Sequence, residues 1–136
     1  MKRKAAIFLC LIALGLETES CESPEQVFEE RCDWVKASVD PEELRSWATK
    51  LIEQREANPK FQDVIPQNEI LPSLRDPRVH VVFHKANEQE KSYVTLQWGG
   101  GFGHWGILVG DPEFRPFRLE RIRYVEWEPG IYFWTQ

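Results

Sequence analysis

His104 is the residue whose type and setting best suit it for chemistry. It stands in a stretch of nine residues, 98–106, that holds five of the chain's eight glycines and one of its three histidines. An imidazole can act as a general base, exchange hydrogen bonds or bind a metal near neutral pH. The glycines indicate a backbone that turns sharply or that another group approaches closely. The stretch is therefore a candidate binding loop, and one hypothesis makes His104 the general base of a small hydrolase.

The glycines do not form a recognisable nucleotide loop. Residues 101–106 fit G-x-G-x-x-G, but a dinucleotide fingerprint requires a helix after its last glycine. The sequence Ile107-Leu108-Val109 predicts a strand there instead. No Gly-Lys-Ser/Thr follows, as a phosphate-binding loop requires, and the kinase signatures are missing. We expect no cofactor.

The remaining histidines and cysteines give weak support for catalysis or metal binding. His80 and His84 lie four residues apart on a predicted strand, which separates them by about 13 Å, too far to share one ion. No H-E-x-x-H or C-x-x-C spacing is present, and we expect no metal site. Cys32 lacks a family signature of a nucleophile, and no G-x-S-x-G elbow is found.

Aromatic residues offer a second route to function, through binding. Six of them gather near the C-terminal end: Trp98, Phe102, Trp105, Trp127, Tyr132 and Trp134. They can form a hydrophobic core or a binding platform, and the sequence leaves both interpretations open. Alternation turns Trp98 toward the helices and leaves the opposite face of the sheet open. The candidate ligand-binding residues are Tyr93, Gln97, Phe102 and His104, and the candidate ligands are a protein, a peptide or a glycan such as a cell-wall fragment.

The charge balance argues against nucleic acid as a partner. The chain has 17 basic and 22 acidic residues, which gives a net charge of −5. Nucleic-acid binding depends on neutralising phosphates with clustered lysine and arginine, and the sequence has no basic run outside its first four residues. A protein, peptide or glycan partner is the better expectation.

Residues 1–20 have the layout of a signal peptide. A basic start, Met1-Lys2-Arg3-Lys4, precedes a twelve-residue apolar run from Ala5 to Leu16, which is too short for a spanning helix. The layout predicts export to the periplasm or the medium and a single domain over residues 21–136.

Cys21 and Cys32 have two competing fates after such processing. A cysteine at the first mature position resembles bacterial lipoproteins, which implies lipidation of Cys21 and attachment to a membrane only through that lipid. In an oxidising compartment Cys21 and Cys32 can instead form a disulfide.

Two N-terminal helices are predicted. Val27, Phe28, Cys32 and Val35 have helical spacing within residues 24–37. A second helix should begin after Asp40 as its cap, with Pro41 in the first position and Glu43 reaching back in a capping box, and end near Glu56. Its apolar stripe, Leu44, Trp47, Ala48, Leu51 and Ile52, is expected to pack on a sheet.

The second half of the chain predicts strands. The runs 79–84, 93–98, 105–109, 118–127 and 131–134 are apolar or alternating, and turn signals such as Pro129-Gly130 separate them. Gly130 should adopt a positive φ. Residues 60–77, rich in proline, are expected to cover the sheet. The predicted fold is α+β, with two N-terminal helices packed on a four- to five-stranded antiparallel meander.

Residues 99–106 and the run Pro129-Gly130-Ile131-Tyr132-Phe133 also resemble the glycine-aromatic tails of small uncharacterised bacterial exported proteins. The resemblance covers about the last forty residues and implies a bacterial source without any activity. The sequence therefore favours an exported binding or interaction module. The alternative is a small hydrolase in which His104 is the general base.

Overall fold

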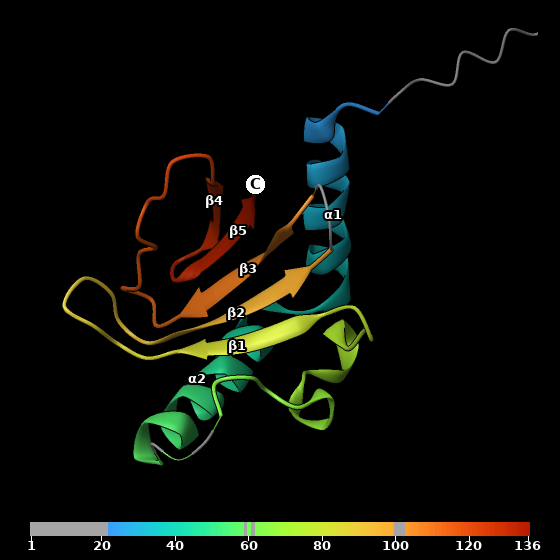
Figure 1. Ribbon diagram of the computed structural model, residues 1–136. Coiled ribbons are helices and arrows are strands. Elements are labelled where there is room, and N and C mark those ends of the chain that lie inside the picture. Colours follow the sequence, from blue (N-terminus) through green and yellow to red (C-terminus); the bar gives the residue numbers. More distant parts are fainter. Residues whose placement is uncertain (1–21, 59, 61, 100–102) are drawn as a thin grey trace, which may run out of the picture.

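The computed structural model describes residues 22–58, 60, 62–99 and 103–136. Two helices come first and five strands follow, with two short 3₁₀ helices between them (Figure 1). In chain order the elements are α1 (Pro24–Ser38), α2 (Pro41–Ala57), η1 (Gln67–Glu69), η2 (Pro72–Leu74), β1 (His80–His84), β2 (Tyr93–Trp98), β3 (Trp105–Gly110), β4 (Arg123–Glu128) and β5 (Ile131–Thr135). This confirms the α+β class and the two N-terminal helices.

Both helices begin at side-chain caps. The Asp40 carboxylate accepts hydrogen bonds from the backbone N–H groups of Glu42 and Glu43, which satisfies two of the free donors at the start of α2. The capping box predicted for α2 is found on α1 instead. There the Ser23 and Gln26 side chains each accept from the other's backbone N–H.

The strand order is β1-β2-β3-β5-β4, and every pairing is antiparallel. The predicted meander is therefore wrong at one point, because β5 lies between β3 and β4. The different exposure of β4 and β5 explains why they exchange places relative to the predicted order. The first four residues of β5 are buried, whereas β4 carries exposed charged residues such as Arg123 and Glu128. The apolar strand takes the interior position and the charged strand takes the edge.

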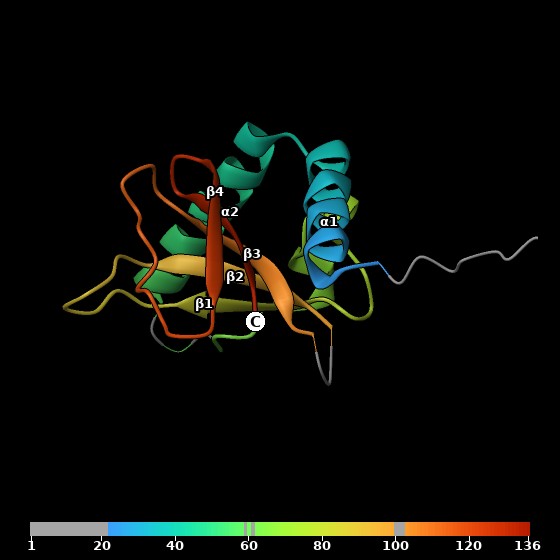
Figure 2. The same cartoon turned by 90° about the horizontal axis from the view of Figure 1, so that it is seen from above.

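The sheet is strongly twisted, so that β1 and β4 run in clearly different directions (Figure 1). The end of α1 and the start of α2 lie together on the same side of β1 and β2 (Figure 2). We call the sheet face that packs against the helices the inner face, and the opposite one the outer face. Alternation along each strand decides which side chains reach which face.

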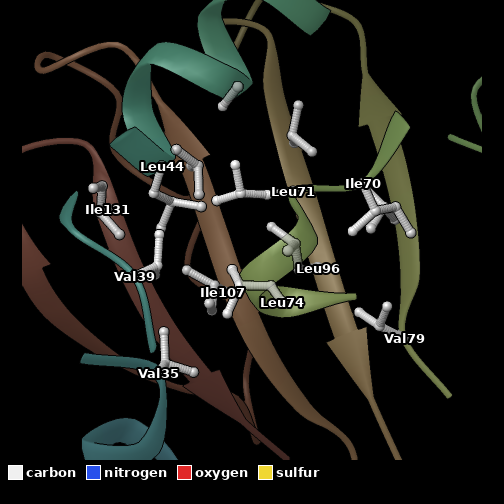
Figure 3. Close-up of a cluster of buried hydrophobic side chains, with 14 of the residues drawn as sticks. Val35, Val39, Leu44, Ile70, Leu71, Leu74, Val79, Leu96, Ile107 and Ile131 are labelled. Atoms are coloured by element: carbon white, nitrogen blue, oxygen red, sulfur yellow. The ribbon is translucent and has the colours of Figure 1, made fainter. Parts of the chain in front are cut away.

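The inner face carries the main core. Side chains from both helices, from the 3₁₀ turns and from the strands meet there, among them Val35, Leu44, Leu74, Leu96 and Ile107 (Figure 3). Leu44, Leu96 and Ile107 have no exposed surface. Trp47 was expected in this core, but it is only partly buried, and its indole N–H donates to the Glu69 carbonyl at 2.9 Å. This hydrogen bond links α2 to η1 at the edge of the core.

Residues 62–77 cover one edge of the sheet, as the prolines predict. The Ile65 N–H donates to the Val81 carbonyl at 2.9 Å, and the Phe83 N–H donates to the Asp63 carbonyl at 2.7 Å. These bonds occupy part of the free edge of β1, which would otherwise be open to another strand. Arg55 of α2 forms an ion pair with Glu69 at 2.9 Å, so the covering segment is also tied to the helix.

The outer face carries a smaller apolar cluster. Leu108, Tyr132 and Trp134 from the strands pack with Phe114, which comes from the chain between β3 and β4. We call residues 111–122 the outer strap. Residues 118–122, which the sequence assigns to a strand, belong to this strap, and β4 begins only at Arg123. The outer face is therefore partly covered, and the hollow that remains lies between the strap and the strands.

Candidate functional site

Two of the candidate ligand-binding residues, Tyr93 and Gln97, point to the outer face from β2. Their neighbours Val94, Leu96 and Trp98 are buried in the inner core, and the alternation of burial along β2 follows from this. His104 immediately precedes β3 and is half-buried. Phe102 lies outside the described residues. The structure thus brings Tyr93 and Gln97 to one surface, with His104 beside Gln97.

A hollow of about 290 Å³ lies between the strands and the outer strap, and we call it the outer-face pocket. Its lining comes from the sheet, from the loop before β2 and from the strap: His84, Gln89, Glu90, Tyr93, Thr95, Gln97, Leu108, Pro116, Phe117, Leu119, Ile122, Tyr124 and Trp134. Four aromatic rings and several apolar side chains provide contact area, while amide, hydroxyl and carboxylate groups provide hydrogen bonds. This mixture is typical of small-ligand sites.

Stacked rings hold one wall of the outer-face pocket in place. The Tyr93 ring lies between His84, at 4.5 Å between centroids, and Phe114, at 4.7 Å. Burial raises the pKa of Tyr93 to about 12, and the nearby Glu90 carboxylate adds to this increase. Burial also lowers the pKa of His84, against the opposing effect of Glu90 and Asp63. The phenol is therefore neutral at neutral pH, and the imidazole shifts toward its neutral form.

The floor of the pocket depends on a glycine. Gly106 of β3 lies directly opposite Trp134 of β5. A methyl group at position 106 would lie 2.7 Å from the Trp134 indole nitrogen and 2.0 Å from the Leu96 carbonyl oxygen. Only a bare backbone therefore allows the indole to lie across β3. The Trp134 N–H is buried without a hydrogen-bond partner among the described residues.

The outer strap is fixed at several points. Phe114 of the strap is 1% exposed and packs against the outer-face cluster, and the Phe117 N–H donates to the Glu90 carboxylate at 2.6 Å. Two apolar side chains remain exposed at the pocket rim, Phe117 at 50% and Leu119 at 52%. Just beyond them Arg121 has φ = +71°, a conformation uncommon outside glycine. The strap thus combines firm attachment with exposed apolar side chains and a strained backbone at its end.

The surroundings of His104 bear on the hydrolase hypothesis. The Gln97 amide nitrogen lies 2.9 Å from His104 Nδ1. The Gln97 side chain therefore engages one of the two ring nitrogens. The described residues give the His104 ring no hydroxyl, thiol or carboxylate partner.

A second group of aromatic residues lies on the inner side, at the end of β2. Trp98 and Trp105 are stacked at 4.8 Å and are 5% and 7% exposed. Trp34 from α1 meets both rings edge-on and remains 44% exposed, and Arg31 lies over the Trp105 ring at 5.3 Å. Of the two interpretations that the sequence left open, Trp98 and Trp105 belong to the core. Trp34, which sequence reasoning did not single out, lines a separate hollow beside them.

Cys32 is buried between α1 and the sheet, at 7% exposure, and forms no disulfide with a described residue. Cys21 lies outside the described residues, so the disulfide and the lipidation stay predictions. Burial raises the pKa of the Cys32 thiol to about 11, which makes it a poor nucleophile.

The raised pKa predicts slow chemical labelling of Cys32. In a variant with Cys10→Ser and Cys21→Ser, reaction with a disulfide reagent at pH 8 should be at least about a hundredfold slower in the native protein than in urea, because thiolate is the reactive form. The absorbance of released thiol measures both rates. Equal rates would mean that Cys32 is accessible and that this side of α1 is not packed.

The described residues contain no group of three or more His, Cys, Asp or Glu side chains placed to hold a metal ion. None of the helices in the described part of the chain is both long and apolar enough to cross a bilayer.

Comparison of the chain with protein-family models, with curated proteins and with solved structures finds no match. Geometry and chemistry therefore carry the functional argument. Of the residues that line the outer-face pocket, the sequence singles out Tyr93 and Gln97 but not the strap residues Phe117 and Leu119. The turn signal at Asp111-Pro112 was visible, yet nothing in the pattern says that the chain after it folds back over the sheet.

Proposed function

We propose that the protein is a binding module whose ligand is a glycan, held by one sugar ring in the outer-face pocket. The observation that carries the proposal is the lining itself. Phe117 and Tyr124 provide aromatic surface, and Tyr93, whose faces are stacked on His84 and Phe114, adds the edge of its ring. Thr95 and Gln97 lie beside them with hydroxyl and amide groups. A sugar ring has apolar C–H faces and a polar edge of hydroxyls, so it can use both kinds of contact.

The size of the pocket supports a small ligand segment. Its volume of about 290 Å³ lies just below the range typical of small-molecule sites, roughly 300 to 1,000 Å³, so it suits one ring. The phenol of Tyr93 is neutral and the Trp134 ring is buried, which leaves Glu90 as the one carboxylate in the lining, and Glu90 already accepts a hydrogen bond from the Phe117 N–H. An uncharged ring therefore suits the pocket better than a charged head group.

Binding, not turnover, is the proposed activity. The described residues give the His104 ring no hydroxyl, thiol or carboxylate partner, and its Nδ1 is engaged by the Gln97 side chain. We expect a ligand to raise the melting temperature without being consumed.

We also propose that the protein is exported. The basic residues at the start of the chain and the apolar run from Ala5 to Leu16 support this. An extracellular or periplasmic binding module would meet cell-wall or environmental glycans. Intact mass of the protein from its native host, compared with the mass of residues 21–136, tests the cleavage.

The pocket assignment predicts the effect of Phe117→Ala. Phe117 is half-exposed at the rim, so its removal should weaken binding of a tetramer of N-acetylglucosamine about five- to tenfold, a loss of about 1 kcal/mol of contact energy, and leave the free energy of unfolding nearly unchanged. Isothermal titration calorimetry measures the affinity.

Val64→Ala is the matched control, because Val64 is 58% exposed and does not line the pocket. It should change neither affinity nor stability. If no soluble oligosaccharide binds at millimolar concentration, the proposal of a glycan ligand is wrong. If Phe117→Ala binds as tightly as the wild type, the pocket is not the site.

A further inference from the structure

A second hollow adjoins the outer-face pocket on the same side of the sheet. It has a volume of about 430 Å³, and Pro116 and Tyr124 line both hollows. Its lining comprises Arg115, Pro116, Arg118, Tyr124, Glu126 and Tyr132, and we call it the arginine pocket. Since the two hollows share two walls, a ligand longer than one ring can occupy both.

The arginine pocket carries more positive than negative charge. The Arg115 guanidinium donates to the carbonyls of Pro112 at 3.2 Å and Phe114 at 2.8 Å, which holds it at the base of the strap. Arg118 is exposed beside it. The one carboxylate in the lining is Glu126, which accepts a long hydrogen bond of 3.4 Å from the Tyr132 hydroxyl. Two guanidinium groups thus face one carboxylate.

Within the described chain, Arg115 and Arg118 have no carboxylate partner of their own. Arg45, Arg55 and Arg78 each form an ion pair with a carboxylate, and the other described arginines do not. No carboxylate among the described residues lies within ion-pair distance of Arg115 or Arg118. In a chain with a net charge of −5, acidic partners are abundant. What sets Arg115 and Arg118 apart is that both line one hollow, where an external anion can reach two guanidinium groups at once.

We propose that the ligand is an acidic glycan, with a carboxylate-bearing sugar in the arginine pocket and its neighbour in the outer-face pocket. This proposal rests on the proposed function of the outer-face pocket. The guanidinium group presents parallel N–H donors that match a carboxylate. Arg118 is the main contact, because Arg115 already donates to two carbonyls.

Glu126 and the net negative charge of the protein determine how much negative charge the ligand can carry. A polyanion would meet repulsion from Glu126 and from the acidic surface beyond the pocket. A chain with one carboxylate on alternate sugars places a single negative charge between the two guanidinium groups. The arrangement thus selects a uronate-type glycan over a densely charged polymer.

The test compares two tetrasaccharides by calorimetry on the protein without residues 1–20 and on the full chain. One is the neutral tetramer of N-acetylglucosamine, and the other alternates glucuronate with N-acetylglucosamine. At about 0.05 M salt the acidic probe should bind about five- to tenfold more tightly, and the preference should shrink at about 0.5 M salt, where exposed charges are screened.

Arg118→Gln should abolish this preference while affinity for the neutral probe stays the same. Arg121→Gln is the matched control, since Arg121 lies on the same strap but lines neither hollow, and it should keep the preference. Equal binding of both probes to the wild type, or a preference that survives Arg118→Gln, overturns the inference and leaves the proposed function intact. Binding of neither probe overturns both.

Discussion

Gly130→Ala is expected to lower the free energy of unfolding by roughly 3 to 5 kcal/mol, because two separate costs fall on one methyl group. Gly130 has φ = +82°, where a residue with a Cβ costs about 1 to 2 kcal/mol. Its added Cβ would also lie 2.1 Å from the Asp111 carbonyl oxygen. That contact is with backbone, so it is relieved only if the turn between β4 and β5 moves.

Moving this turn would disturb the sheet where the outer strap begins. The Gly110 N–H donates to the Gly130 carbonyl at 2.9 Å, so the turn is bonded to the end of β3. Urea unfolding of Gly130→Ala and of the exposed neighbour Glu128→Ala measures the effect. The control should stay within about 0.5 kcal/mol of the wild type. A similarly small effect for Gly130→Ala would mean that the turn is not packed against Asp111.

Leu44→Ala is expected to cost about 2 to 5 kcal/mol. Leu44 is fully buried where α2 meets the sheet, and it lies among Val39, Leu71 and Ile131 in the core (Figure 3). Truncation removes apolar contact and leaves a cavity that the surrounding strands cannot close completely. Because the whole fold has a stability of only roughly 5 to 15 kcal/mol, the variant should melt well below the wild type.

Leu119→Ala provides the same change of side chain at a position that is 52% exposed. It should cost less than about 1 kcal/mol, since little buried area is lost. Urea denaturation with constant m-values compares the two variants. If both leucines cost the same, the inner face is not the main core.

The parts of the fold that the sequence predicts are those governed by local signals. Asp40 and Pro41 define the start of α2 because capping and the fixed φ of proline act over a few residues. Gly130 adopts the predicted positive φ for the same reason. Alternation along β2 also predicts correctly which side chains face the helices.

The parts that sequence reasoning missed depend on contacts between distant residues. Nothing local says that β5 pairs with β3, where Trp105 lies opposite Thr135. The competition between β4 and β5 for the interior position is decided by which strand has more apolar surface to bury on both faces. Likewise the strap folds over the sheet because Phe114 finds a place against Tyr93 and Tyr132, which its own sequence does not reveal.

The candidate site shows the same division. Tyr93 and Gln97 could be predicted because strand periodicity alone places them on one face. Arg115, Arg118 and Phe117 could not, because they enter the site from a segment without secondary structure. The only sequence signal for these three residues is the mixture of apolar and basic residues in 115–121, and an ordinary surface loop can have the same composition.

The interior position of β5 has a consequence for the order in which the chain can fold. Helices α1 and α2 and strands β1 to β3 precede residues 131–135 in the chain, so β3 keeps one edge unpaired until β5 is present, although all six of its residues are buried in the native fold. An apolar edge left open in this way is prone to pair with other chains. Chains truncated before Ile131 should therefore aggregate, whereas chains that include β5 should not.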